Sequence, residues 1–225
     1  MLPAGEFCPP EAFRRLLEKR VPTFGLTLSG LALERLSRFL AKLDRMRRQT
    51  NLTGPLRTQE LVDHALESIL GERLVPPRAE LIDIGSGAGF PGIPLAIARP
   101  DVCVTPVEPR RKRLEFLKEA SKEVGLVNVF AHETSVTNLR KDFADVATAR
   151  AVGQIDEILG QAPFLKPEGL FLAWTTKANA QRLARRLERH FSPGERLAVP
   201  ESRHKVIASF RKHVPRGTME SKTSD

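Results

Sequence analysis

The sequence predicts an α/β fold in which a doubly wound, mostly parallel sheet follows an N-terminal helical appendage. Two observations predict it. Apolar residues recur with helical spacing over residues 10–74, and from residue 80 onward short apolar runs alternate with helical segments. Strict alternation of strand and helix implies right-handed crossovers and a parallel sheet. We therefore divide the chain into an appendage at 1–79, a sheet domain at 80–212 and a disordered tail at 213–225.

Length and composition bound the class of protein. The 225 residues exceed the roughly 100–200 of a typical domain, which predicts one elaborated domain. Hydrophobic residues make up 41% and charged residues 28%, a globular composition. The sequence lacks both an apolar stretch of membrane-spanning length and the apolar run of a signal peptide. We expect a cytoplasmic protein, a monomer without membrane contact.

Cysteine usage predicts neither a disulfide framework nor a metal site. The two cysteines, Cys8 and Cys103, lie far apart and form no CxxC pair. We expect core or incidental thiols and no bound metal.

Two helices are clearest in the appendage. The first begins after Ser29, a suitable N-cap, and its apolar residues recur at intervals of three and four through Met46. The second is expected over 58–74, ended by two consecutive prolines. Between them lies a polar loop with Asn51 and Thr53, for which a turn-and-capping role is one interpretation.

Beyond residue 80 the sequence predicts five strands with four helices between them. Pro106 is a difficulty for the second strand, because proline lacks a ladder donor; it would mark a strand end or a bulge. The expected strands are 81–84, 102–107, 127–131, 145–149 and 170–174, the helices 93–98, 110–124, 155–165 and 179–191, and an antiparallel edge pair 195–199 and 205–211.

The most informative segment is a glycine-rich turn after the first strand. Gly85, Gly87 and Gly89 alternate there, directly before a predicted helix. Glycine permits positive φ and lets a ligand approach the backbone, while the N–H groups of a helix start favour a polar or anionic group. A cofactor site is therefore expected, and a tight turn without a ligand is the alternative.

Two cofactor classes fit this turn. The G-x-G-x-G register from Gly85, with Asp83 two residues earlier, is typical of S-adenosylmethionine-dependent methyltransferases. A dinucleotide fingerprint, G-x-G-x-x-G, would need its third glycine at Phe90, although an overlapping one begins at Gly87. Glu108, after the second strand, is placed to accept hydrogen bonds from a ribose in either class. The alternative to methyl transfer is an NAD(P)-dependent oxidoreductase or a nucleotide-binding module.

The net charge of +9 lies outside the middle of the chain. Residues 1–79 carry +4, residues 80–176 carry −2 and residues 177–225 carry +7. Basic flanks fit a nucleic-acid-binding surface, and a merely well-solvated surface is the alternative. A predicted C-terminal helix places four arginines three and four residues apart, where they would suit RNA phosphates: Arg182, Arg185, Arg186 and Arg189.

The residues from 51 to 177 resemble a known family. The most specific string is IDIGSGAGFPGIPLAIARPD at 82–101, because ordinary methyltransferases lack its Pro-Gly-Ile-Pro sequel. The Asn-Leu-Thr at 51–53, the RRKRLEFLKE stretch from Arg110 and the Thr-Ala-Arg-Ala at 148–151 extend the match. On these motifs the chain resembles the bacterial 16S ribosomal RNA guanine-N7 methyltransferases, the glucose-inhibited division protein B family.

This resemblance implies a Rossmann-like methyltransferase that uses S-adenosylmethionine to methylate N7 of a guanine in 16S ribosomal RNA or the small ribosomal subunit. Arg150 would be a catalytic positioning residue beside the cofactor, near the target base. The implied cofactor-binding residues are Gly85, Gly87, Gly89, Phe90, Glu108, Val136, Thr137 and Arg150, and the implied RNA-binding residues are Asn51, Thr53, His64 and Lys177, which join the four arginines.

Several positions leave alternatives open. Asp63 stands where the family usually has arginine, and the lysine after the last parallel strand is shifted to Lys177. His64 would equally suit a packing role, and Arg150 a salt bridge at a strand end. A methyltransferase acting on a small molecule or a protein is the nearer functional alternative.

Overall fold

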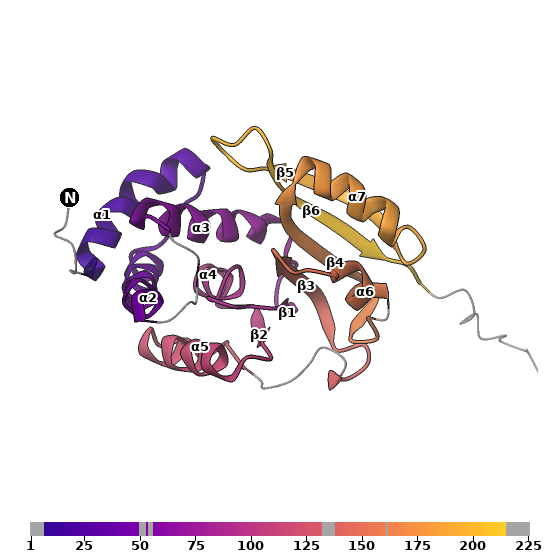
Figure 1. The fold of residues 1–225 in the computed structure, drawn as a ribbon, viewed down its shortest axis with the longest axis horizontal. Helices are drawn as coiled ribbons and strands as arrows, with labels where there is room; N and C mark the ends of the chain where they lie inside the picture. The colour runs from indigo at the N-terminus through magenta and orange to yellow at the C-terminus, as the bar shows by residue number, and fades with distance from the viewer. Residues whose placement is uncertain (1–6, 50–52, 54–55, 132–137, 161, 215–225) are drawn as a thin grey trace, which may run out of the picture.

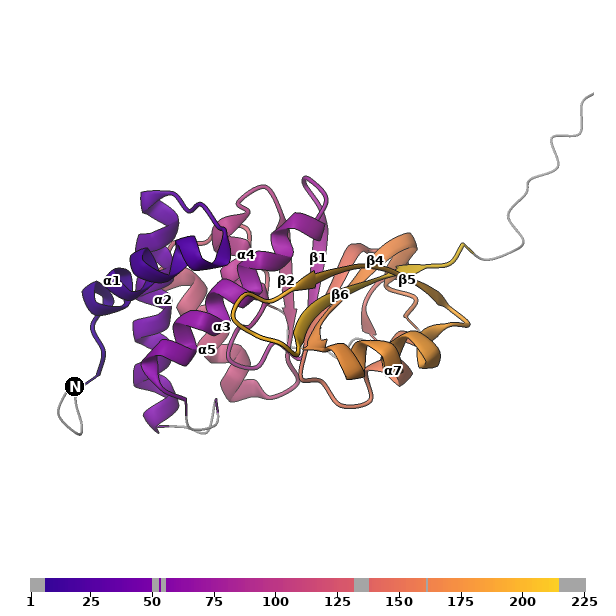
Figure 2. The ribbon, with the colours of Figure 1, turned by 90° about the horizontal axis from the view of Figure 1, so that it is seen from above.

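The structure, a computed structural model, describes residues 7–49, 53, 56–131, 138–160 and 162–214. A central sheet has helices on both faces, and the N-terminal helices lie on the same side as α4 and α5 (Figure 1). Viewed from above, α7 lies along the other end of the molecule, under β6 (Figure 2). No helix in the described ranges is long and apolar enough to cross a membrane.

The N-terminal segment is helical, as predicted. It comprises α1 (Pro10–Arg20), α2 (Gly30–Gln49) and α3 (Thr58–Leu70), and α3 continues into a 3₁₀ turn at Gly71–Leu74. The hydroxyl of Ser29 accepts a hydrogen bond from the Ala32 N–H at 3.1 Å, so the predicted N-cap is confirmed.

The predicted mostly parallel sheet is confirmed. Its order is β2-β1-β3-β4-β6-β5. The first four strands in this order are parallel, whereas β6 pairs antiparallel with β4 and β5. The strands are β1 (Glu80–Ile84), β2 (Cys103–Val107), β3 (Ala144–Arg150), β4 (Leu165–Thr176), β5 (Phe191–Ala198) and β6 (Lys205–Lys212).

The position of β2 resolves the difficulty at Pro106. Among the described strands β2 is at the sheet edge, and its only outer pairing is an isolated bridge between Val104 and Val129. A proline in an edge strand need not remove a ladder hydrogen bond. Pro106 therefore lies within the strand, opposite Asp83, rather than ending it.

The strand predicted at 127–131 is wrong, because this segment forms only that bridge. Two backbone hydrogen bonds connect it to Val104. The side chain of Asn128 turns inward and donates to three carbonyl oxygens, those of Ala96, Arg99 and Val102. The segment thus binds the backbone at the C-terminal end of α4 instead of extending the sheet.

The crossover helices are α4 (Gly92–Ala98), α5 (Arg111–Glu123), α6 (Ile155–Gly160) and α7 (Lys177–Leu187). Two predicted helix ends are wrong. The helix predicted to 165 ends at Gly160, shortly before Pro163, which disfavours helical backbone ahead of it. The helix predicted to 191 ends at Leu187, because Phe191 is buried at the start of β5.

Two apolar clusters cover opposite faces of the sheet. One joins α1 to α5 with residues such as Leu81 and Val146, and the other joins α6 and α7 with residues such as Ile82 and Ala147. The N-terminal helices therefore share a continuous core with the sheet. The boundaries at 79 and 212 stay predictions.

A close approach at Gly71 connects the end of α3 to the sheet. A Cβ atom built at Gly71 would overlap the ring of Trp174 in β4. The Trp174 indole N–H donates to the carbonyl oxygen of Glu67, one turn earlier, at 2.7 Å. Only glycine at position 71 leaves room for this contact.

We expect Gly71→Ala to lower the free energy of unfolding by about 1–3 kcal/mol, the cost of overpacking a close contact. Urea-induced unfolding followed by circular dichroism measures it. Gly30→Ala is the control, because a Cβ atom there meets nothing within 4 Å. Equal stabilities of the two variants would contradict the steric argument.

Candidate functional site

The predicted site residues gather at the carboxyl edge of the parallel strands. The glycine turn follows β1, Glu108 follows β2, and Arg150 ends β3. In doubly wound sheets this edge is where ligands bind. The topology therefore brings together side chains from distant parts of the sequence.

Each alternating glycine of the turn has positive φ: +67° at Gly85, +55° at Gly87 and +95° at Gly89. At Gly89 a Cβ atom would lie 2.9 Å from Ile93 Cγ1, so internal packing also requires glycine. At Gly87 the nearest atoms would be an Arg113 nitrogen at 3.6 Å and the Gly85 carbonyl oxygen at 3.7 Å. These are ordinary van der Waals distances, so close packing does not require glycine at position 87.

Glu108 is fixed beside this turn. Its side chain is buried, and its two oxygens accept the N–H groups of Gly87 and Arg110, each at 3.0 Å. An ionised carboxylate offers about four acceptor positions, so two remain for hydroxyl groups. Glu108 can therefore accept the ribose hydroxyls that its sequence position predicts.

Asp83 stabilises the turn through buried hydrogen bonds. Its carboxylate is fully buried and accepts the Thr148 hydroxyl at 2.8 Å and the Gly92 N–H at 3.1 Å. Burial raises the pKa of Asp83 to about 6, although these hydrogen bonds oppose the shift. Asp83 thus connects β1, β3 and the start of α4.

These features fit a nucleoside cofactor such as S-adenosylmethionine. A positive-φ turn would face the polar part of the cofactor, and Glu108 would hold its ribose. Phe90 contributes backbone here, since its ring packs in the core edge-to-face against Phe39 and His64. The predicted adenine-flanking residues, Val136 and Thr137, lie outside the described residues.

A buried carboxylate that the sequence analysis did not assign organises the neighbouring region. Glu67 on α3 contacts Arg150 at 2.8 Å and Lys205 at 2.5 Å. The Glu67 side chain is only 6% exposed, and that of Arg150 16%. Burial lowers the pKa of the Arg150 guanidinium, and the charge of Glu67 opposes this shift. Glu67 is the one charged residue in the apolar last two turns of α3, at 65–70, and this was the available signal in the sequence.

Arg150 therefore has a structural partner as well as a position at the site. Its guanidinium also donates to the backbone carbonyl of His64 at 3.3 Å. The salt bridge expected as the alternative is present. Arg150 also lines a cavity, and its role as a positioning residue stays a prediction.

His64 lies on the inner side of α3. Burial, followed by the charges of Arg150 and Lys205, lowers its pKa to about 3. A neutral imidazole supplies no positive charge to RNA near pH 7. The preceding Asp63 has a structural partner in Arg20, at 2.9 Å.

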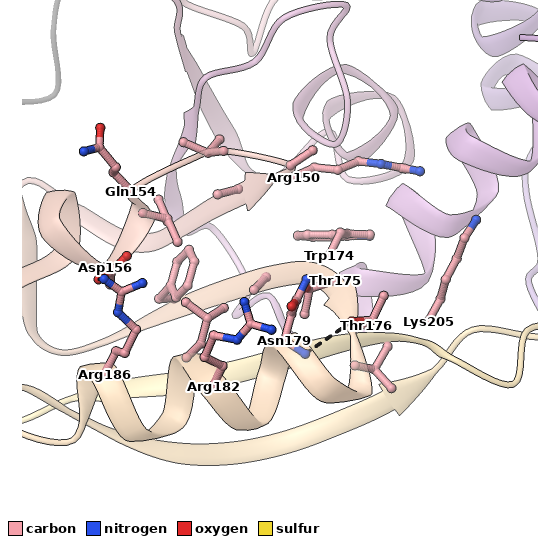
Figure 3. Close-up of a pocket in the computed structure, with 18 of the residues that line it drawn as sticks. Arg150, Gln154, Asp156, Trp174, Thr175, Thr176, Asn179, Arg182, Arg186 and Lys205 are labelled. Carbon is pink, nitrogen blue, oxygen red and sulfur yellow. Dashed lines mark hydrogen bonds and ion pairs between the residues drawn. The ribbon is translucent and has the colours of Figure 1, made fainter. Parts of the chain in front are cut away.

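A cavity of about 430 Å³ lies beside Arg150, between the segment after β3 and α7. Figure 3 shows Arg182 and Asn179 projecting from α7 toward that segment, and Arg186 beside Asp156. Trp174 and Lys205 also line the cavity. None of the glycines of the turn, nor Glu108, is among the lining residues.

The other predicted RNA-binding residues are dispersed. Lys177 begins α7 and is exposed, but it does not line the cavity. Arg185 is exposed on α7, whereas Arg189 lies in the turn after the helix, so the four arginines do not share one helical face. Thr53 is half-buried, and Asn51 lies outside the described residues. No three His, Cys, Asp or Glu side chains in the described segments are placed to hold a metal ion.

Comparisons with known proteins agree with this geometry. A family model described as rRNA small subunit methyltransferase G matches residues 32–209. The ribosomal RNA small subunit methyltransferase G of Wolinella succinogenes is 38% identical over 67% of this chain and 79% of that protein. Its namesake from Halorhodospira halophila is 38% identical over 76% of this chain and 82% of that protein. The one from Ralstonia nicotianae is 34% identical over 86% of this chain and 94% of that protein.

Solved structures support the fold. A SAM dependent methyltransferase from Aquifex aeolicus gives a TM-score of 0.54 at 16% identity, covering 66% of this chain and 89% of that chain. A tRNA methyltransferase from the same organism gives 0.56 at 15% identity, covering 67% and 69%. The Rossmann-like methyltransferase fold predicted from the sequence is therefore confirmed.

We expect Glu67→Gln to lower the free energy of unfolding by about 3 kcal/mol, because it leaves the buried Arg150 without a counter-ion. Glu18→Gln is the matched control, since it removes an equal charge from an exposed pair with Arg14. That pair should contribute less than about 1 kcal/mol. Chemical denaturation of both variants measures the difference, and a loss no greater than in Glu18→Gln would contradict the role of Glu67.

The lowered pKa of His64 predicts a pH-dependent stability. Between about pH 3 and pH 6.5 the unfolded chain binds a proton at His64 that the folded chain does not, so stability falls on acidification. Relative to His64→Gln, the protein should lose roughly 1 kcal/mol per pH unit below pH 6. Urea unfolding between pH 4.5 and pH 7 measures it. His190→Gln, in an exposed turn, is the control, and parallel curves for the protein and His64→Gln would refute the prediction.

Proposed function

The chain belongs to the rRNA small subunit methyltransferase G family, and we propose that it transfers a methyl group from S-adenosylmethionine to N7 of a guanine in 16S ribosomal RNA. The observation that carries this proposal is the positive-φ glycine turn beside Glu108, next to a cavity whose lining includes Arg150, Arg182 and Lys205. The ribosomal RNA substrate also supports a cytoplasmic location.

The residues present suit this reaction. When bound, S-adenosylmethionine supplies a methyl group on a positively charged sulfur. Guanine N7 is an acceptor with a lone pair and no proton, so no general base is needed. The requirement on the protein is alignment of the reacting atoms. Gly85, Gly87 and Glu108 would hold the cofactor, and Arg150, fixed by Glu67, would orient the base or a polar group of the cofactor.

The alternatives are less well supported. Family membership favours methyl transfer over NAD(P)-dependent oxidoreduction. A small-molecule or protein substrate would not require basic flanks, whereas ribosomal RNA gives the charge excess at both ends of the chain a role in binding phosphates. The experiment below distinguishes free RNA from the assembled small subunit as the substrate.

We expect Gly87→Leu to abolish binding of S-adenosylhomocysteine in calorimetry, because the side chain would occupy the space that the cofactor needs at the turn. Gly125→Leu is a matched control. Gly125 also has positive φ, at +70°, and the atom nearest to its Cβ atom would likewise be a guanidinium nitrogen, at 3.8 Å. The two variants carry similar backbone strain, of about 1–2 kcal/mol, so equal loss of binding would show that strain alone is responsible.

The same pair tests the reaction in cells. Nucleoside mass spectrometry of small-subunit RNA should find 7-methylguanosine restored by the protein and by Gly125→Leu, but not by Gly87→Leu. Purified free RNA and assembled particles, methylated in vitro, then identify the substrate form. Unchanged methylation in cells lacking the protein would overturn the proposed function.

A further inference from the structure

The cavity beside Arg150 is distinct from the glycine turn and has its own chemistry. Half of the residues that line it are apolar, among them Val152, Ile155 and Leu183, and the other half are polar or charged. A volume of about 430 Å³ lies within the roughly 300–1,000 Å³ typical of small-molecule sites. The cavity therefore has the size and composition of a site for one compact, partly apolar group.

The cationic side chains around the cavity differ in whether they have a counter-ion. Arg150 and Lys205 share the carboxylate of Glu67, and Arg186 pairs with Asp156 at 2.7 Å. Arg182 has no hydrogen bond or ion pair with any residue that the structure describes, although it lines the same cavity. Among the cavity-lining cations it is therefore the one available to an anion from outside.

A second polar group lies one turn away from Arg182. Asn179 is exposed at the start of α7. Its backbone N–H donates to the Thr176 hydroxyl at 3.2 Å, and its side-chain amide has no partner among the described residues. Its side-chain amide is directed to the same side of α7 as Arg182 (Figure 3). An amide next to a guanidinium can bind a phosphate oxygen and a neighbouring hydroxyl together.

We propose that this cavity holds one nucleotide of the RNA substrate, with its phosphate on Arg182 and its base against the apolar wall. The inference rests on the proposed function and deepens it, because it separates a nucleotide subsite over β3 and β4 from the cofactor turn after β1. Val152 lies between them, with its Cγ2 atom 3.0 Å from where a Cβ atom of Gly85 would stand. A base in the cavity would thus lie next to the cofactor turn.

Tryptophan fluorescence can report on binding at this subsite. Trp174 is the only tryptophan, the sequence contains no tyrosine, and Trp174 lines the cavity. Its fluorescence can be followed while guanosine 5′-monophosphate or guanosine is added to protein saturated with S-adenosylhomocysteine. Saturation excludes binding of the added nucleotide at the cofactor turn.

We expect guanosine 5′-monophosphate to change the Trp174 emission and to bind more tightly than guanosine. Arg182→Gln should raise its Kd about tenfold, as for one lost charge-assisted contact, and bring it close to that of guanosine. Arg15→Gln, an exposed arginine on α1, removes the same charge and should leave the Kd unchanged. With small-subunit RNA, Arg182→Gln should also raise the concentration for half-maximal methylation, which distinguishes an RNA subsite from one for free nucleotide only.

Several results would overturn the subsite. The first two are equal Kd values for guanosine 5′-monophosphate and guanosine, and a loss of affinity in Arg15→Gln as large as in Arg182→Gln. The third is calorimetric binding without a change in Trp174 emission. The fourth is binding of free nucleotide with RNA methylation that does not depend on Arg182. Each leaves the proposed function intact. Conversely, absence of 7-methylguanosine formation in cells would contradict the proposed function while the fluorescence titration still reports on the cavity.

Discussion

The carboxylate of Glu67 is the interaction on which the site most depends. It lies among the mostly apolar buried residues of α3, and it binds two cations from different parts of the sheet, Arg150 at the end of β3 and Lys205 at the start of β6. Its carbonyl oxygen also accepts the Trp174 indole N–H from β4. One residue thus fixes α3 against three strands. Since breaking a buried ion pair leaves an uncompensated charge, this arrangement resists change.

The glycine turn depends on a second buried carboxylate. Asp83 spans from β1 to β3 through Thr148 and to the start of α4 through Gly92. This brace orients the turn so that Gly89 packs inward, whereas a Cβ atom at Gly87 would make only ordinary van der Waals contacts. Both carboxylates therefore act indirectly, because they set the positions of groups that a ligand would meet.

Pairing within the protein decides which positive charges are available for binding. Of the arginines on α7, Arg186 is partly neutralised by Asp156, whereas Arg182 is unpaired among the described residues and lines the cavity. Arg150 and Lys205 are held by Glu67. Net charge alone treats these residues as equivalent. Their partners make them different, because an ion pair lowers the field that a cation presents to an incoming phosphate.

The sequence by itself determined the class of fold, most element positions and the glycine turn after β1. Those predictions succeeded because they rest on local features: strand and helix periodicity, the Ser29 cap, and glycines required by positive φ. It did not determine that Pro106 lies within an edge strand, that residues 127–131 form only a bridge, or that α7 stops at Leu187. Nor did it identify Glu67 as the partner of Arg150, 83 positions away. Such outcomes depend on which distant segments meet, and only tertiary packing decides that, because it sets which charges are buried together and which remain free to bind.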